Sequence, residues 1–198
     1  MRGKFIVFEG LDASGKETQA KKLVKYLKSK GINSIYTDEP TSSNSIGRFI
    51  KNWLARRIDI KSSYSIPLLF AADRYEHLKT IIKPELEKGT WVISDRYMYS
   101  TLAYETAILG GGKEIMTWIE ELHKFILLPD LIIYIDIHPE ESVRRKPNGD
   151  RLEHIEMQRK VQKVYYEIKD KFNFVMINGE RPIEEVFMNI IKEIEKIM

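Results

Sequence analysis

The sequence predicts an α/β protein built on a five-stranded, mostly parallel sheet with helices on both faces. Short apolar runs that suit strands buried on both faces alternate with stretches whose apolar residues recur at helical spacing. This alternation is typical of parallel sheets covered by crossover helices. The chain has 198 residues, 43% of them hydrophobic, and no linker, so we predict one domain spanning 1–198.

The predicted elements follow one another without long interruptions. The strands are the apolar runs 5–8, 34–36, 91–94, 131–135 and 174–177. The apolar stripes of the predicted helices, interpreted as core positions, are Ala20, Leu23, Val24 and Leu27; Ile46, Phe49, Ile50, Trp53 and Leu54; Ile115, Trp118, Ile119 and Leu122; and Val186, Ile190 and Ile194. In such sheets ligands bind beyond the carboxyl ends of the strands, so we expect the functional residues in the loops that follow them.

The loop after the first strand carries a glycine, four residues and then Gly-Lys, the spacing of a phosphate-binding P-loop. Its residues are Gly10, Leu11, Asp12, Ala13, Ser14, Gly15, Lys16, Glu17 and Thr18. The glycines let successive N–H groups turn toward an anion at a helix N-terminus, and Lys16 reaches the β- and γ-phosphates. A chance glycine turn is the alternative, but strand, loop and helix occur in the order that the mechanism needs. The predicted fold is therefore of the P-loop NTPase type.

Two charged residues follow the third predicted strand. Asp95 ends an apolar run with a carboxylate, which can lie near the Mg²⁺ of a bound nucleotide. Arg96 can grip a phosphate with its planar fork of donors and stabilise charge during phosphoryl transfer. A capping or salt-bridge role for Asp95 and a surface position for Arg96 are the alternatives.

Residues 142–153 are predicted to form a mobile lid. Arg144, Arg145, Lys146 and Arg151 place four positive charges around a Pro-Asn-Gly turn between two helical patterns. Such a segment can close over a triphosphate, exclude water and bring arginines to the transition state. A solvated basic loop is the alternative.

Composition narrows the classes of partner. The net charge of +3 is spread over alternating Lys and Glu without a basic stripe, so we expect no nucleic-acid partner. No apolar stretch reaches membrane-spanning length, and the chain enters its first strand without a signal peptide, so we expect a cytoplasmic protein with no membrane partner. Cysteine is absent and the four histidines lack ligand spacing, which leaves Mg²⁺ as the expected metal.

Several motifs together resemble the thymidylate kinase family over nearly the whole chain. They are Phe8-Glu9-Gly10-Leu11-Asp12 through Gln19, Glu39-Pro40, Leu69-Phe70-Ala71-Ala72-Asp73-Arg74, Asp95-Arg96-Tyr97, Ser100-Thr101-Leu102-Ala103-Tyr104 and Pro129-Asp130-Leu131. The resemblance implies a nucleoside monophosphate kinase that transfers the γ-phosphoryl group of ATP to dTMP, forming dTDP in dTTP synthesis. It also implies a homodimer, for which helices bearing Trp53 or Trp118 could supply the apolar interface.

The resemblance also assigns roles to residues in the dTMP site. Phe70 is expected to stack on thymine, Arg74 to bind a base carbonyl, and Thr101 to help read the base edge. Tyr104 is expected to crowd the sugar 2′ position and Asp12 to reach the 3′-hydroxyl. Core packing is the alternative for both aromatic residues.

The remaining family-like positions concern the phosphates and adenine. Glu39 and Arg96 are expected to contact dTMP, with Arg96 holding the acceptor phosphate between the substrates. Asn178, after the last strand, resembles the stretch that lines the adenine pocket. Because the P-loop itself has no basic residue, we expect Arg144, Arg145 or Arg151 to join Lys16, Arg96 and Asp12 in catalysis.

Two positions depart from the family pattern. Glu17 stands where a hydroxyl residue usually holds Mg²⁺, and we expect it to turn outward with Thr18 or water taking its place beside Asp95. Asp38 stands where the family usually has arginine, and Arg48 is a candidate replacement for the lost contact with dTMP.

Two other functions stay open at this point. The chain could be a P-loop kinase for another deoxynucleotide or for a deoxynucleoside, in which case Glu39 could serve as the base. It could instead be a P-loop ATPase or a nucleotide-binding module, although no guanine-reading motif or single-strand-binding stripe supports this.

Overall fold

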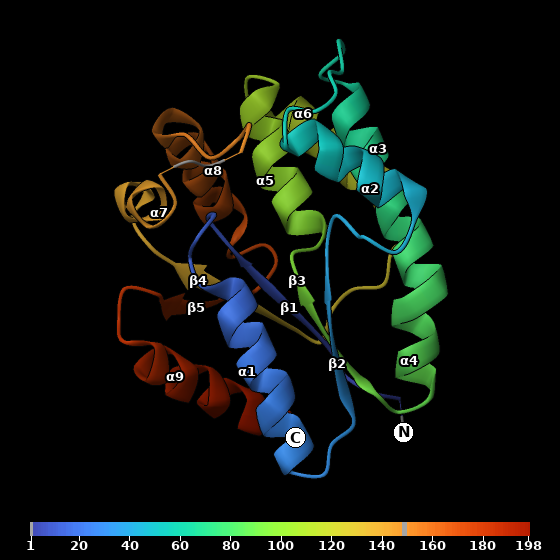
Figure 1. Cartoon of the computed structure of the whole chain (residues 1–198), viewed down its shortest axis with the longest axis vertical. Helices are drawn as coiled ribbons and strands as arrows, with labels where there is room; N and C mark the ends of the chain where they lie inside the picture. The colour runs from blue at the N-terminus through green and yellow to red at the C-terminus, as the bar shows by residue number, and fades with distance from the viewer. Residues whose placement is uncertain (1, 148–149) are drawn as a thin grey trace.

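A computed structural model describes residues 2–147 and 150–198 and shows a parallel five-stranded sheet between helical layers (Figure 1). The strands are β1 Phe5–Gly10, β2 Ser34–Asp38, β3 Trp91–Asp95, β4 Leu131–Asp136 and β5 Val175–Asn178. They lie in the order β2-β3-β1-β4-β5, and every pairing is parallel. All five predicted strands and the parallel sheet are thus confirmed, with Phe174 just before β5.

Helices connect the strands. They are α1 Lys16–Ser29, α2 Ser45–Leu54, α3 Ser65–His77, a π-helical turn η1 Leu78–Ile82, α4 Lys83–Glu87, α5 Met98–Ile108, α6 Lys113–Leu122, α7 Pro139–Arg145, α8 Ile155–Ile168 and α9 Ile183–Glu195. Within the described residues, no helix has both the length and the apolar character needed to cross a membrane.

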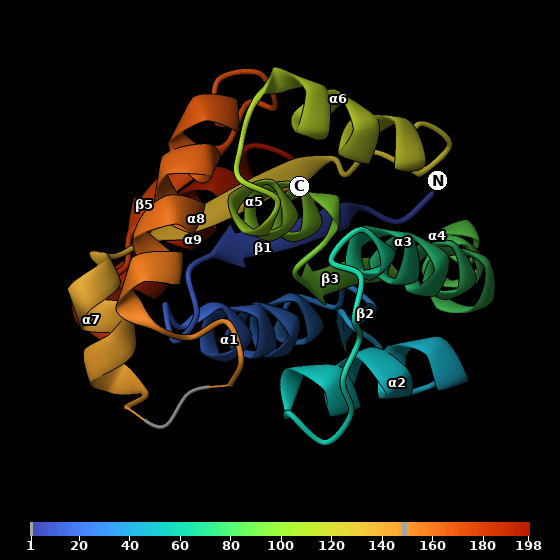
Figure 2. The ribbon, with the colours of Figure 1, turned by 90° about the horizontal axis from the view of Figure 1, so that it is seen from above.

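The sheet separates two hydrophobic cores, because successive side chains of a strand point to opposite faces. In β1, Phe5 and Val7 join the core beneath α5, α6 and α8, whereas Ile6 and Phe8 join the core beneath α1 and α9. Figure 2 shows α1 on one side of β1 and α5 and α6 on the other. Helices therefore cover both faces, as predicted.

The carboxyl end of β1 lies between β3 and β4, where the chain must turn sharply into α1. Gly10 has φ 144°, and a Cβ atom there would lie 2.5 Å from the Ile135 carbonyl oxygen of β4. Gly15 has φ 96° and directly precedes Lys16, the first residue of α1. Both glycines are required by the backbone, and together they place the P-loop at the switch point of the sheet.

A buried carboxylate holds the loop between β2 and α2. Asp73 of α3 accepts hydrogen bonds from Thr41 N (2.8 Å), Thr41 Oγ1 (2.7 Å) and Asn44 Nδ2 (2.7 Å). Asn44 also caps α2 by accepting from Gly47 N at 2.8 Å. These bonds fix the path of the chain from Glu39 into α2.

Candidate active site

Two cavities open beyond the carboxyl ends of the strands, and they share part of their walls. The P-loop cavity encloses about 1350 Å³ and is lined by Ala13, Gly15, Lys16, Glu17, Thr18, Lys21, Tyr36, Asp38, Asp95, Arg145, Lys146 and Glu153. The helical cavity encloses about 560 Å³ and is lined by Pro40, Leu54, Phe70, Arg74, Tyr97, Ser100, Thr101, Tyr104, Glu105, Asp150 and Leu152. Asp12, Glu39 and Arg96 line both cavities, so the two meet at these residues.

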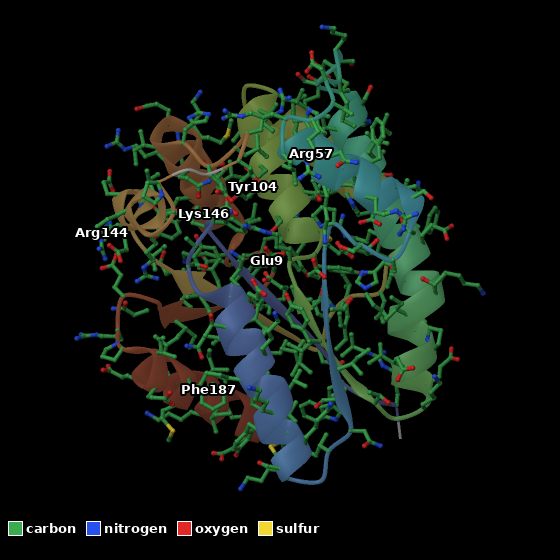
Figure 3. All side chains as sticks on the ribbon, viewed as in Figure 1. Glu9, Arg57, Tyr104, Arg144, Lys146 and Phe187 are labelled. Carbon is green, nitrogen blue, oxygen red and sulfur yellow. The ribbon has the colours of Figure 1, made fainter. Side chains whose placement is uncertain are left out.

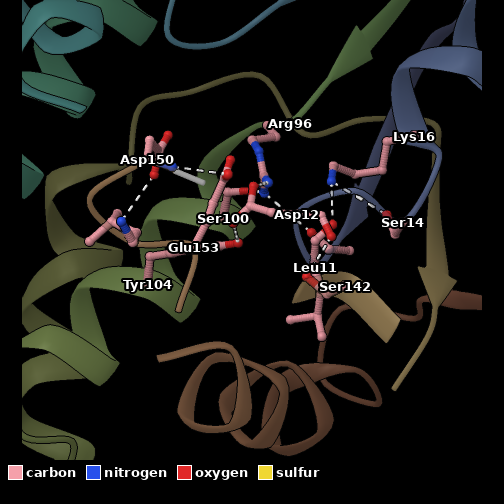
Figure 4. Close-up of polar contacts among 12 residues, drawn as sticks. Leu11, Asp12, Ser14, Lys16, Arg96, Ser100, Tyr104, Ser142, Asp150 and Glu153 are labelled. Atoms are coloured by element: carbon pink, nitrogen blue, oxygen red, sulfur yellow. Dashed lines mark hydrogen bonds and ion pairs between the residues drawn. The ribbon is translucent and has the colours of Figure 1, made fainter. Parts of the chain in front are cut away.

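Lys16 is folded back onto its own loop. Its ammonium donates to the Leu11 carbonyl at 2.6 Å and to Ser14 Oγ at 3.4 Å (Figure 4). The side chain is only 5% exposed, and burial together with the positive charge of Arg96 lowers its pKa to about 8. An anion in the cavity would favour the charged form, so the site is built to gain from binding phosphate.

Arg96 and Asp12 form the centre of the shared wall. Arg96 Nη2 donates to Asp12 Oδ1, while Nη1 donates to Ser100 Oγ at 2.9 Å and to the Gly10 carbonyl at 3.2 Å (Figure 4). Its guanidinium also lies over the Tyr104 ring, 5.2 Å from the centroid. The backbone of Arg96 has φ 71°, a left-handed conformation that costs a non-glycine residue free energy and is found preferentially at functional sites.

Asp12 has no free carboxylate oxygen in this arrangement. Oδ2 accepts from Tyr104 Oη at 2.5 Å and from Gln158 Nε2 at 2.9 Å, and Oδ1 accepts from Arg96. Burial alone would raise the pKa of Asp12, but Arg96 and Lys16 outweigh it and hold the pKa below its usual range. The carboxylate is therefore ionised at neutral pH and fixes the orientation of both Arg96 and Tyr104.

The residues considered for Mg²⁺ differ in how they face the P-loop cavity. Glu17 pairs with Lys21 one turn later and its side chain is 63% exposed, which matches the outward orientation expected for it. Asp95 Oδ1 is buried without a hydrogen-bond partner among the described residues, and burial raises the pKa of this carboxyl. Mg²⁺ binds through one or two carboxylates plus phosphates and water. Asp95 and Thr18 in a phosphate cavity therefore fit this ion.

In the helical cavity, Arg74 is locked in place by three elements. Its Nε donates to Glu39 Oε2 at 2.8 Å, its Nη2 to Thr101 Oγ1 at 3.1 Å, and its Nη1 to His123 Nε2 at 2.5 Å. The guanidinium is 1% exposed and lies over the Tyr97 ring. Phe70, one turn before Arg74 on α3, lines the same cavity. This wall presents an aromatic ring and an immobilised cation.

Two histidines that the sequence left without a role complete this network. His123 Nδ1 donates to the Ile119 carbonyl at 2.7 Å, which leaves Nε2 as the acceptor for Arg74. Burial and the nearby Arg74 charge lower the pKa of His123 to about 3, so the ring is neutral. His77 Nδ1 lies 2.9 Å from Glu39 Oε1. Both oxygens of Glu39 are thus engaged, and Glu39 is not free to act as a base.

The three lid arginines take different positions. Arg145 donates to the Ala13 carbonyl of the P-loop at 3.3 Å and to the Gly179 carbonyl at 3.1 Å. Arg144 pairs with Glu141 on its own helix and is 74% exposed; Figure 3 shows it at the outer edge of α7. Arg151 lies over the Trp53 ring at 5.3 Å and donates to the Trp53 carbonyl at 3.2 Å. Only Arg145 of these described arginines lines the P-loop cavity.

The predicted lid, residues 142–153, corresponds to more than one structural element. Its first residues are the end of helix α7 rather than loop, and residues 148–149 lie outside the described part of the chain. Lys146 Nζ pairs with Glu153 Oε1 at 2.6 Å, and both line the P-loop cavity. Asp150 and Leu152 line the helical cavity. The segment therefore borders both cavities, and its mobility stays a prediction.

Three predicted site residues lie elsewhere or are otherwise engaged. Arg48 is exposed and donates to the Ser42 carbonyl and to Ser45 Oγ; it lines neither cavity. Asp38 pairs with Lys51 at 2.9 Å, which offsets its charge at the edge of the P-loop cavity. Asn178 accepts from Glu180 N and lines a separate hollow, although its neighbour Gly179 reaches Arg145.

Two further carboxylates were not singled out from the sequence. Glu9, at the end of β1, is fully buried and accepts from Tyr97 N (2.9 Å), Ser100 Oγ (2.5 Å) and Tyr165 Oη (2.8 Å), which ties β1 to α5 and α8 (Figure 3). An acid directly after an apolar strand was a signal for it. Glu105 lies one turn after Thr101 on α5, so helical spacing alone could have placed it in the helical cavity.

Comparison with known proteins places this geometry in a family. The family model described as thymidylate kinase matches residues 8–190. A thymidylate kinase of Plasmodium falciparum is 37% identical over 197 residues, covering 99% of this chain and 91% of the relative. A probable thymidylate kinase of Pyrococcus abyssi is 41% identical over 200 residues, covering 96% and 95%. The solved structure of thymidylate kinase from Candida albicans superposes with a TM-score of 0.86 at 30% identity, covering 98% of this chain and 92% of that one.

Proposed function

This chain belongs to the thymidylate kinase family and is an ATP-dependent dTMP kinase, and we propose that ATP occupies its P-loop cavity and dTMP its helical cavity. The observation that carries this assignment is the shared wall. Asp12, Glu39 and Arg96 line both cavities, so a donor phosphate in one and an acceptor phosphate in the other would meet at Arg96.

On the ATP side, the P-loop supplies backbone donors and one cation. The N–H groups at the start of α1 point to the anion, and Lys16 exchanges its contacts with Leu11 and Ser14 for phosphate oxygens. Asp95 and Thr18 would hold Mg²⁺, with Glu17 outside the coordination sphere. When bound, Mg²⁺ neutralises charge on the β- and γ-phosphates.

On the dTMP side, the cavity suits a flat, uncharged pyrimidine. Phe70 offers a ring face for stacking, and Arg74 is held with its guanidinium at the cavity wall by Glu39 and His123. Arg74 can donate to a base carbonyl but not to a group that is itself a donor. Tyr104, fixed by Asp12, lies where the sugar would pass toward Arg96.

The transfer step needs alignment and positive charge more than proton transfer. The dTMP phosphate is already an anionic nucleophile, so no general base is required. Arg96 would hold the acceptor phosphate, and Lys16 and Arg145 would neutralise charge on the transferred group. Because both oxygens of Glu39 are occupied by Arg74 and His77, the site favours a phosphate acceptor over a nucleoside hydroxyl that needs a base.

We also propose that the enzyme is a homodimer that acts in the cytoplasm. Phe49 on α2, Leu68 on α3 and the nearby Tyr64 are 45–55% exposed and form an apolar surface, with Tyr64 packed edge-on against Trp118. Trp53, in contrast, is mostly buried. Exposed apolar residues of this kind are suited to contact with a second copy. Light scattering tests the dimer, and cell fractionation tests the location.

A substrate panel tests the assignment of the cavities. ADP formation is measured with Mg-ATP and dTMP, dUMP, dCMP, dGMP, UMP or thymidine. We expect dTMP to be the preferred acceptor and ATP turnover to depend on the acceptor. Phosphorylation of thymidine with dTMP inert, or ATP hydrolysis at the same rate without an acceptor, would contradict the proposal. Titration with EDTA, followed by Mg²⁺ readdition, tests the metal.

A further inference from the structure

Glu105 is a buried acid that nothing in the fold accounts for. It lies on α5, is 1% exposed and lines the helical cavity. Neither of its carboxyl oxygens has a hydrogen-bond partner among the described residues. Glu9, equally buried, accepts hydrogen bonds at both oxygens. An unpartnered buried carboxyl is costly to the fold, so its presence in a ligand cavity points to a ligand that supplies the missing partners.

The cations in this cavity are already committed elsewhere. Arg74 bonds to Glu39, Thr101 and His123, and Arg96 bonds to Asp12. The other titratable groups lining the cavity are Tyr97, Tyr104 and Asp150. None of these neighbours pairs with Glu105, and burial alone raises its pKa to about 8. At neutral pH the group is a carboxylic acid, with one O–H donor and one carbonyl acceptor side by side.

This pair of groups matches one edge of thymine. The ring N3–H is a donor, and each carbonyl beside it is an acceptor. We propose that Glu105 is a specificity-determining residue that binds thymine as a neutral acid, accepting from N3–H and donating to an adjacent carbonyl. This inference rests on the proposed placement of dTMP in the helical cavity. An ionised Glu105 could still accept from N3–H, but it would set a negative charge against the carbonyl oxygen.

The same chemistry assigns separate tasks to two neighbours. A neutral carboxyl can also pair with the N3 and amino group of cytosine, so Glu105 alone does not separate the two pyrimidines. Arg74 can only donate and therefore requires a carbonyl, which cytosine lacks at the amino position. Glu105 would supply affinity for the ring edge, and Arg74 would reject the amino group.

The test uses Glu105→Gln, Glu105→Leu and the wild-type enzyme. Glutamine keeps a donor beside an acceptor but cannot ionise, whereas leucine removes both. At saturating Mg-ATP, we expect the wild-type KM for dTMP to rise above pH 8, by up to about tenfold per pH unit as the acid ionises. The Gln variant should keep a KM within about threefold of wild type at pH 7 and lack this extra rise. The Leu variant should raise KM about tenfold or more at every pH, with kcat changed much less.

A stability measurement checks the protonation of Glu105 without using dTMP. A carboxyl whose folded pKa lies above its unfolded value favours the folded state fully only below the unfolded pKa. Its contribution is lost as the pH rises from about 4.5 to about 8. Glu105→Gln should therefore remove part of the decline in Tm across this window, and Glu105→Leu should be at least as stable as wild type at pH 8.

Each outcome bears on a different statement. Parallel pH profiles of KM for wild type and Glu105→Gln, or a Leu variant with unchanged KM, would overturn the inference. If the wild-type enzyme does not phosphorylate dTMP at all, the proposed function fails, and the inference about thymine fails with it. If dTMP is phosphorylated and the Tm profiles of wild type and the Gln variant coincide, only the protonation of Glu105 is wrong.

Discussion

Replacing Arg96 with lysine tests whether the geometry of the shared wall, rather than its charge alone, carries catalysis. The guanidinium spans three acceptors: Asp12 from Nη2, and Ser100 Oγ and the Gly10 carbonyl from Nη1. A lysine ammonium is a single nitrogen on a flexible stem and cannot reach both arms of this fork. Arg96→Lys therefore keeps the positive charge and loses the planar arrangement that we assign to the acceptor phosphate.

The magnitude follows from the bonds that are lost. A hydrogen bond to a charged group contributes about 1.5–3 kcal/mol. Loss of one such bond in the transition state therefore lowers kcat by about 10- to 150-fold, since 1.36 kcal/mol corresponds to a factor of ten. Asp12 would lose part of its compensation as well, so we also expect a lower Tm.

The assay is steady-state ADP formation with dTMP varied at saturating Mg-ATP, together with thermal unfolding. Arg159→Lys is the matched control, because Arg159 is exposed on α8 and pairs only with Glu140 and Glu156 among the described residues. We expect the control to retain wild-type kcat. A kcat for Arg96→Lys within about threefold of wild type would refute the role assigned to the fork, because less than 1 kcal/mol would then depend on it.

Three further outcomes follow from the P-loop. Glu17→Ser should leave kcat and the Mg²⁺ dependence nearly unchanged, since Glu17 faces Lys21 and solvent; a large loss in the same assay would show that the carboxylate is used. Gly10→Ala should destabilise the protein by about 2 kcal/mol or more beyond Gly31→Ala in urea titrations, because both glycines have positive φ but only Gly10 would clash with a neighbouring carbonyl. Affinity for Mg-ATP, measured by calorimetry, should fall as the pH rises above about 8, because Lys16 then loses its charge; Lys16→Met should flatten that profile, and an unflattened profile would assign it to another group.

The phosphate-binding half of the site was predictable because it is local in sequence. Gly10, Gly15 and Lys16 lie within seven positions, and their spacing alone specifies a turn, a close approach and a cation at a helix start. The strands were predictable for the same reason, because apolar runs report burial on both faces. The family-like motif placed Phe70 and Arg74 together because residues four apart share a helix face.

The acceptor half depended on contacts between residues far apart in the chain. His123 meets Arg74 across 49 positions and Gln158 meets Asp12 across 146, and no periodicity connects such pairs. Arg48 shows the converse error, since its distance from Asp38 in sequence suggested a replacement that the path of α2 does not allow.

Local patterning was thus enough for the strand order's raw material, the P-loop and the class of reaction, because each depends on neighbouring residues and on the side-chain periods of helix and strand. Tertiary packing decided which charges are neutralised and which acid is left unpartnered. It fixed Glu39 between Arg74 and His77, faced Arg145 rather than Arg144 toward the P-loop, and buried Glu105 in the helical cavity. The reason is physical: protonation and orientation depend on burial and on partners that only the folded chain brings together.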